Sequence, residues 1–382
     1  MSLHGQKNIR NFIFGHSLIN HAIPINPTPS QETAVPHWFA DLARSAGNQY
    51  AVGGQYGFLP QHTNLPPLAQ WGFDNAVGAW DSDNEDFGRA DFNTILITPG
   101  NFIQWQGPDE DYPTDPTSPV EATVTVFDWC NAQEENLNYY VYENWPDMAP
   151  YLNNDFPPSN DEWQAYNNYL ESDFHNWFVD YYSKVSENFS DNCISFIPVG
   201  TLMSRLLQTP PYNQIPIAQL YEDDAPHGRP TIYFLASLVT YMSMYEEEAP
   251  LNYEVDPIIH PIVADNYQDV VMFLWTELEK MQEESELTIF CGKSTTSTTK
   301  NDLQENKITI FPNPTNSTIN VSGQVVDGTL QVFNLLGSYQ LSTIINSKNK
   351  TVDLTGLQSG SYLIIGRDDF GTLIYRELIV KL

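Results

Sequence analysis

The pattern of side chains changes abruptly at residues 291–306, and this change constrains the fold more than any other feature. The segment, CGKSTTSTTKNDLQEN, has almost no large apolar residues and is rich in Ser and Thr, a composition typical of linkers. Upstream of it, helix-like and strand-like segments alternate, whereas only short β-type runs follow it. We therefore predict two domains, residues 1–290 and residues 307–382, joined by this linker.

The first predicted domain alternates between buried-type strands and amphipathic helices. Strands are expected at residues 9–14, 92–98, 122–128, 138–143 and 194–199. Helices are expected at residues 36–46, 161–187, 201–207, 230–245 and 267–284. Such alternation indicates a mostly parallel sheet covered on both faces. The predicted fold class is therefore α/β, with three layers in the order α/β/α.

The second predicted domain holds seven short β-type runs separated by Pro, Gly, Asn and Asp. Seven runs within fewer than 80 residues, with turn residues between them, predict a small all-β sandwich.

The charge of the chain is distributed unevenly. The 382 residues include 48 acidic and 16 basic side chains, which give a formal net charge of -32. Residues 1–300 carry 41 acidic and 10 basic residues, whereas residues 301–382 carry 7 and 6, so -31 of the charge lies upstream. Because a protein that grips phosphates needs clustered Lys and Arg, this composition excludes most nucleic-acid partners.

Neither a membrane span nor a disulfide framework is expected. No segment approaches the roughly 18 consecutive apolar residues of a transmembrane helix, and residues 1–10 lack the apolar core of a signal peptide. The three cysteines, Cys130, Cys193 and Cys291, show no metal-type spacing and are odd in number. We expect buried or free thiols, with at most one pair.

Ser17 is the first candidate for chemistry. It lies in Gly15-His16-Ser17-Leu18, directly after a predicted strand. A strand that ends in Gly-x-Ser places the hydroxyl at the carboxyl edge of the sheet, where open α/β folds bind their ligands. A serine that follows glycine in an ordinary turn is the alternative.

The second candidate is Asp224-Ala225-Pro226-His227, which precedes the helix predicted at 230–245. A nucleophilic serine needs a base, and the imidazole of that base needs an acceptor that fixes its tautomer. Asp and His three residues apart in one loop could supply both groups. A plain helix-entry turn is the alternative.

In combination, the two motifs resemble those of the GDSL/SGNH hydrolases over roughly residues 8–246. The resemblance implies a flavodoxin-like domain and a serine esterase. By this resemblance Ser17 is the nucleophile, His227 is the general base and Asp224 is the acceptor. His16 and Asp223 are the rivals for the last two roles, but His16 should face away from its neighbour Ser17, and only Asp224 has the family spacing.

The family's oxyanion hole combines the serine amide, a glycine amide and an asparagine side chain. Carried over by resemblance, these roles fall on Ser17, Gly54 and Asn101, with Gly57 as the alternative glycine. The sequence departs from the family in having Gly-His-Ser-Leu for Gly-Asp-Ser-Leu, and in having Phe102 after Asn101 where the family has Asp.

Residues 139–182 are dense in Tyr and Trp. Aromatic side chains stack on sugar rings, which would suit a carbohydrate ester, although most of these residues follow a helical stripe that core packing explains. Trp145, beside Pro146 at a strand end, is the expected pocket wall.

The C-terminal runs carry an ordered set of motifs. Ile308-Thr309-Ile310-Phe311-Pro312-Asn313-Pro314 is followed by Leu330-Gln331-Val332-Phe333-Asn334 and later by Gly360-Ser361-Tyr362-Leu363. This order closely resembles the type A sorting domain of the type IX (Por) secretion system of Bacteroidetes-type bacteria. The resemblance implies the type IX machinery as a partner and a secreted or outer-surface location. Since family members carry a leader, the start at Met1 suggests a truncated or engineered terminus.

These inferences predict a secreted or cell-surface serine esterase that works through an acyl-serine intermediate. An O-acetylated carbohydrate is the favoured ester substrate, and no metal or organic cofactor is needed. The alternative is a non-catalytic surface glycan-binding protein on the same scaffold.

Overall fold

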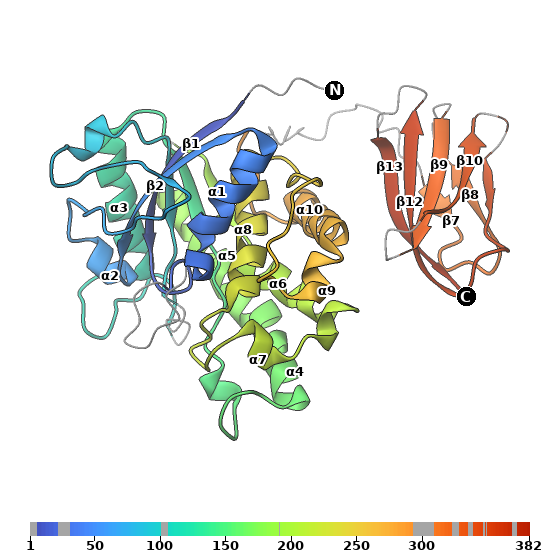
Figure 1. Cartoon of the computed structure of the whole chain (residues 1–382), viewed down its shortest axis with the longest axis horizontal. Coiled ribbons are helices and arrows are strands. Elements are labelled where there is room, and N and C mark those ends of the chain that lie inside the picture. Colours follow the sequence, from blue (N-terminus) through green and yellow to red (C-terminus); the bar gives the residue numbers. More distant parts are fainter. Residues whose placement is uncertain are drawn as a thin grey trace. The chain divides into compact units, whose positions relative to one another are not determined.

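The computed structural model describes all residues except 1–5, 22–30, 101–105, 191, 293–308, 323–327, 335–338, 347, 349 and 369–372. The chain forms two compact units, residues 1–295 and 296–382 (Figure 1). Most of the predicted linker lies outside the described residues. Within the described part of the chain, every helix is too short or too polar to cross a bilayer.

A parallel six-stranded sheet forms the centre of the first unit, in the order β3-β2-β1-β4-β5-β6. Apolar side chains on both faces of its central strands are buried, as expected for parallel strands covered on both sides. The strands are β1 (Asn8–Gly15), β2 (Gln49–Tyr56), β3 (Val77–Gly78), β4 (Thr94–Ile97), β5 (Asn138–Tyr142) and β6 (Ile194–Ile197).

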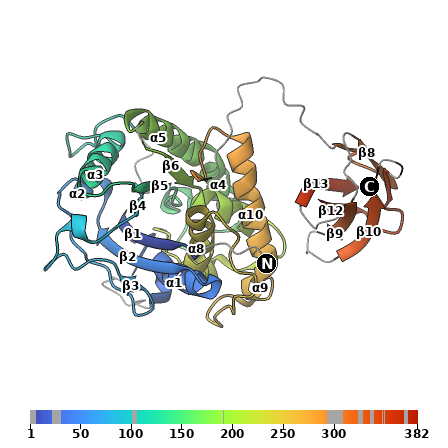
Figure 2. The same ribbon diagram turned by 90° about the horizontal axis from the view of Figure 1, so that it is seen from above.

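Helices cover both faces of this sheet (Figure 2). On one face α1 (Val35–Ala46) packs against α8 (Pro230–Tyr245), and on the other α3 (Pro119–Gln133) packs against α5 (His175–Asn188). The remaining helices are α2 (Leu59–His62), α4 (Asn160–Tyr169), α6 (Val199–Gln208), α7 (Ile217–Leu220), α9 (Pro261–Ala264) and α10 (Tyr267–Glu284). The predicted α/β class and the three layers are confirmed.

Two local predictions are wrong. Residues 122–128, expected as a strand, lie inside α3, where Ser118 and Glu121 form a capping box that begins the helix. The β-branched residues after this cap imitate a strand pattern. Conversely, β2 is absent from the predicted strands because Gly53 and Gly54 weaken its β signal.

Two of the three cysteines form the one pair that the odd count allowed, so the expectation of thiols holds for Cys130 alone. Cys193 and Cys291 form a disulfide with their Cα atoms 6.0 Å apart, whereas Cys130 is a buried free thiol. The segment before Cys291 runs along the edge of the sheet, where Phe196 N–H donates to the Thr288 carbonyl at 2.7 Å. Sequence spacing could not reveal this pair, because 98 residues separate the two cysteines.

The second unit contains two antiparallel sheets, ordered β10-β9-β12-β13 and β11-β8-β7. Apolar residues of both sheets form one shared core, so the predicted β-sandwich is confirmed. The strands are β7 (Thr309–Phe311), β8 (Thr318–Ser322), β9 (Gly328–Asn334), β10 (Tyr339–Ile345), β11 (Thr351–Asp353), β12 (Gly360–Asp368) and β13 (Leu373–Lys381).

Candidate active site

Ser17 lies at the switch point of the parallel sheet. After β1 the chain builds β2 and β3 on one side and then returns to form β4 on the other side, so a crevice is expected at the carboxyl ends of β1 and β4. The chain turns sharply after Gly15, and the amides of Ile19 and Asn20 both donate to the His16 carbonyl, at 2.9 and 3.2 Å. This turn presents Ser17 at the carboxyl edge.

His227 lies on a tight loop directly before α8. Residues Tyr221 and Gly228 form an antiparallel bridge, and the Glu222 amide donates to the His227 carbonyl at 2.9 Å. A further bond from the Arg229 amide to the Leu220 carbonyl, at 2.7 Å, closes the base of the loop. We call residues 221–228 the histidine loop.

Three side chains form a continuous hydrogen-bonded chain across these two segments. His227 Nε2 lies 3.0 Å from Ser17 Oγ, and His227 Nδ1 lies 2.8 Å from Asp223 Oδ2. With Nδ1–H donating to the carboxylate, Nε2 is left to accept the serine proton. Partial burial raises the pKa of Asp223, but the hydrogen bonds from His227 outweigh burial and hold that pKa below its usual value.

The acceptor for His227 is therefore Asp223, and the prediction of Asp224 is wrong. In the histidine loop the two oxygens of Asp223 face His227 together, since Oδ1 also accepts the His227 backbone N–H at 2.9 Å. The Asp224 side chain is exposed, and its carbonyl accepts the amides of Met148 and Ala149 at 2.9 and 3.3 Å. The chain reversal at 222–227 brings the residue four positions before His227, rather than three, beside the ring.

Trp145 supports the histidine loop through a hydrogen bond and does not line a pocket. Its side chain is fully buried, and Nε1 donates to the Pro226 carbonyl at 2.9 Å. The expectation of a pocket wall is wrong because the indole is enclosed between the end of β5 and the histidine loop. Trp145, Met148 and Ala149 together join the segment after β5 to this loop.

Tyr233 joins α8 to the turn at residues 15–20, which we call the serine turn. Its hydroxyl donates to the Ser17 carbonyl at 2.7 Å, and its side chain is fully buried. Burial raises the pKa of this phenol well above its usual value, so it remains a hydrogen-bond donor. Since α8 begins just after the histidine loop, one helix contacts both halves of the site.

The predicted oxyanion glycine is not oriented for that role. The Gly54 carbonyl accepts the amides of Gln70 and Trp71, at 2.8 and 3.2 Å, on the side of β2 that faces away from β1. In a strand the N–H of a residue points to the same side as its carbonyl, so the Gly54 amide also faces away from Ser17. Glycine is required here by packing, because a Cβ would overlap the Trp71 ring.

Of the other candidate donors to the oxyanion, only the Ser17 amide is both described and free of another acceptor. The amide of the alternative glycine, Gly57, donates to the Gly15 carbonyl at 2.9 Å. Asn101 lies outside the described residues. Within the described part of the chain, the Ser17 amide donates to no acceptor, so it stays a candidate donor.

His16 faces away from the site, as expected. Its Nε2 donates to the Pro99 carbonyl at 3.1 Å, and its Nδ1 accepts the Leu18 amide at 3.3 Å. Complete burial lowers the pKa of His16 to about 4. Both ring nitrogens are thus engaged away from Ser17.

A residue that the sequence did not suggest contacts the site directly. The ring of His21 stacks on the ring of His227, with centroids 3.8 Å apart and planes at 17°. Glu222 also approaches this ring, with Oε2 3.8 Å from His21 Nε2. The sequence offers one signal for His21, which is that it follows Ser17 by only four residues; it belongs to no recognisable motif.

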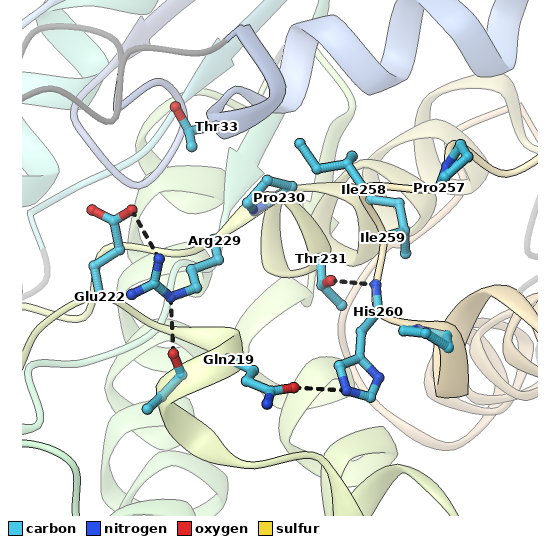
Figure 3. A pocket seen from close by; sticks show the side chains of 12 residues that line it. Thr33, Gln219, Glu222, Arg229, Pro230, Thr231, Pro257, Ile258, Ile259 and His260 are labelled. Atoms are coloured by element: carbon cyan, nitrogen blue, oxygen red, sulfur yellow. Dashed lines mark hydrogen bonds and ion pairs between the residues drawn. The ribbon is translucent and has the colours of Figure 1, made fainter.

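A pocket of about 650 Å³ adjoins the histidine loop (Figure 3). Glu222 belongs to both the loop and the pocket, and pairs with Arg229 at 3.8 Å. In the same pocket, His260 Nε2 and Gln219 Oε1 form a hydrogen bond of 2.9 Å. The lining residues are Thr33, Ala218, Gln219, Glu222, Arg229, Pro230, Thr231, Pro257, Ile258, Ile259, His260 and Pro261.

Residues 309–381 match the family model of the secretion system C-terminal sorting domain, which confirms the prediction for the second unit. The protein is thus one that is sorted for export to the cell surface or beyond. Among the described residues, no group of three or more His, Cys, Asp or Glu side chains is placed to hold a metal ion.

The chain is also similar to solved structures. A GDSL-like lipase from Parabacteroides merdae is 12% identical, with a TM-score of 0.37, over 63% of this chain and 97% of the other. LAE5, an alpha/beta hydrolase enzyme from the metagenome of Lake Arreo, Spain, is 12% identical, with a TM-score of 0.36, over 63% of this chain and 96% of the other. No curated protein matches the sequence significantly.

Proposed function

We propose that the first unit is a serine esterase of the SGNH/GDSL type. The observation that carries the proposal is the chain from Ser17 through His227 to Asp223, with contacts of 3.0 and 2.8 Å, at the carboxyl edge of a parallel sheet. These groups have the roles that nucleophilic catalysis requires, namely a hydroxyl, a base within hydrogen-bond reach and a carboxylate that orients the base.

In the proposed cycle, His227 Nε2 takes the Ser17 proton as Oγ attacks the ester carbonyl carbon. Asp223 stabilises the imidazolium, which then donates its proton to the departing alkoxide, leaving an acyl-serine. His227 then deprotonates a water molecule that attacks the acyl carbonyl, and the imidazolium returns this proton to Ser17 Oγ as the acid is released. The Ser17 amide and the Asn101 side chain are our candidates for stabilising the oxyanion.

The pocket beside the histidine loop offers polar groups to a substrate, although none of Ser17, Asp223 and His227 lines it. Half of the residues that line it are polar or charged, among them the Glu222–Arg229 pair. Hydroxyl-rich ligands match such a lining, so we propose an O-acetylated carbohydrate as the ester.

A fluorophosphonate probe tests the proposal, because it forms a bond only with an activated serine. We expect the purified full-length protein to be labelled, and Ser17→Ala and His227→Ala to lose both labelling and hydrolysis of 4-nitrophenyl acetate. Labelling that persists in Ser17→Ala would overturn the nucleophile assignment.

The same experiment separates the enzyme from a non-catalytic glycan-binding protein on this scaffold. If the wild-type protein binds acetylated glycans but shows neither labelling nor ester turnover, the esterase proposal fails. Release of acetate from acetylated xylan, but not from the same polymer after alkaline deacetylation, is the result expected for the proposed substrate class.

A further inference from the structure

The His227 ring is fixed at its edges by hydrogen bonds and at one face by another ring. Its two nitrogens contact Ser17 and Asp223 in the plane of the imidazole. These bonds leave the ring free to tilt about the line that joins them. His21 covers one face at a centroid distance of 3.8 Å and so opposes that tilt.

His21 is itself held rigidly by the backbone. Its amide donates to the Thr33 carbonyl at 3.0 Å, and neighbouring Asn20 bridges Ala34 in an antiparallel pair. The Val35 amide, at the start of α1, donates to the Ile19 carbonyl at 2.8 Å. The stacked ring is therefore anchored to the serine turn and to α1, and not to the histidine loop alone.

Burial keeps His21 neutral. Burial, followed by the neighbouring His227, lowers the pKa of His21 to about 4, against the opposing effect of Asp223. Glu222 faces its Nε2 at 3.8 Å and is shared with Arg229. At neutral pH the contact with Glu222 thus joins a carboxylate to an uncharged imidazole, and the stack places no second positive charge against His227.

We propose that His21 is a positioning residue for the general base, an inference that rests on the proposed function. The neutral ring limits the tilt of His227 and excludes water from one of its faces. It also offers a π-face to the imidazolium that forms when His227 takes the serine proton, an interaction that favours the charged state. A cationic side chain in this place would oppose that proton transfer.

Two substitutions of His21 in the full-length protein test the proposal. His21→Ala removes the stack, and we expect it to lower kcat for 4-nitrophenyl acetate about tenfold while KM changes less than about threefold, because a misaligned base affects the chemical step. His21→Phe keeps a flat ring, and we expect kcat within about threefold of wild type. Fluorophosphonate labelling rates should follow kcat in both variants.

A purely structural role predicts a different pattern. In that case His21→Ala lowers Tm while kcat of the folded protein stays at the wild-type value, a result that would overturn the proposal. His37→Ala is the matched control, since it removes another half-buried imidazole, in α1, that does not contact His227. We expect it to leave kcat unchanged.

The state of His21 can be measured without activity. An NMR titration of the imidazole carbon shifts should give His21 a midpoint near pH 4. A midpoint near about 6.5, the value of an unperturbed imidazole, would contradict the neutral stacked ring. If wild type fails to label, the proposed function fails; if wild type labels and His21→Ala labels equally fast, only the positioning role fails.

Discussion

Ser17 and His227 are positioned by two different kinds of structure. Ser17 follows a central strand, and the pairing of β1 with β2 and β4 fixes where that strand ends. The histidine loop belongs to no sheet, and its position depends on hydrogen bonds from Trp145, Met148 and Ala149. The serine is therefore placed by the register of the sheet, and the base by contacts between distant segments.

This difference predicts that, Ser17 and His227 themselves aside, substitutions of residues that hold the histidine loop and its base affect catalysis more than substitutions of residues that hold the turn around Ser17. The first prediction, with the largest expected loss of kcat, is the replacement of Asp223, the acceptor for His227. Asp223→Asn keeps the size of the side chain but leaves the imidazolium without its carboxylate, so we expect kcat to fall about 10³-fold. The measurement is steady-state hydrolysis of 4-nitrophenyl acetate.

Asp224→Asn is the matched control for this prediction, because the neighbouring carboxylate is exposed and does not contact His227. We expect kcat within about threefold of wild type. Equal losses in the two variants would show that the histidine loop adopts another conformation in solution.

The second prediction concerns the support of the loop. Trp145→Phe removes the donor to the Pro226 carbonyl and leaves that carbonyl buried without a partner, at a cost of about 2 kcal/mol in unfolding free energy. We expect kcat to fall about tenfold as the loop shifts. Thermal unfolding and the ester assay measure the two effects, and an unchanged kcat would show that the backbone bonds from Met148 and Ala149 suffice.

The third prediction tests the serine side. Tyr233→Phe deletes the hydroxyl that donates to the Ser17 carbonyl. Because the strand and its turn still fix Ser17, we expect kcat to fall less than about threefold, while stability falls about 1–2 kcal/mol. A loss of kcat larger than that of Trp145→Phe would reverse the comparison, since it would mean that the serine turn is the less secure half.

The smallest effect on catalysis is expected from removal of the disulfide, which lies at the amino end of the edge strand β6. Replacing Cys193 and Cys291 together by Ser removes a crosslink near the amino end of β6, whereas Ser17 lies at the carboxyl ends. We expect a loss of about 2–4 kcal/mol in unfolding free energy and no change in kcat well below Tm. A changed kcat in the folded variant would show that the amino ends of the strands influence the site at their carboxyl ends.

The same comparison explains what the sequence could predict. Ser17 and His227 can be predicted from the sequence because each lies in a short motif next to a clearly periodic element, β1 or α8. The choice between Asp223 and Asp224 depends on how the chain reverses between Glu222 and His227, which no periodicity encodes. The two-domain pattern and the β-sandwich follow from composition and turn residues in the same local way.

Contacts between distant segments were not predictable for the same reason. The burial of Trp145 against the histidine loop depends on where the segment after β5 meets that loop. The stack of His21 on His227 joins residues more than 200 positions apart and needs no side-chain type that a motif would mark. The Gly54 assignment failed because a glycine that accommodates Trp71 looks, in sequence, like one that exposes its amide.

The disulfide has a consequence for the covalent topology of the first unit. Cys193 and Cys291 close a ring of chain that contains the histidine loop, α8 and α10, whereas Ser17 lies outside it. A proteolytic cut at an exposed site between Cys193 and His227, such as Asn213 or Gln214, separates Ser17 from His227 in the chain but leaves both pieces joined by the disulfide. An exported protein that meets foreign proteases would thus keep its base and its nucleophile in one molecule after a single cut, until the disulfide is reduced.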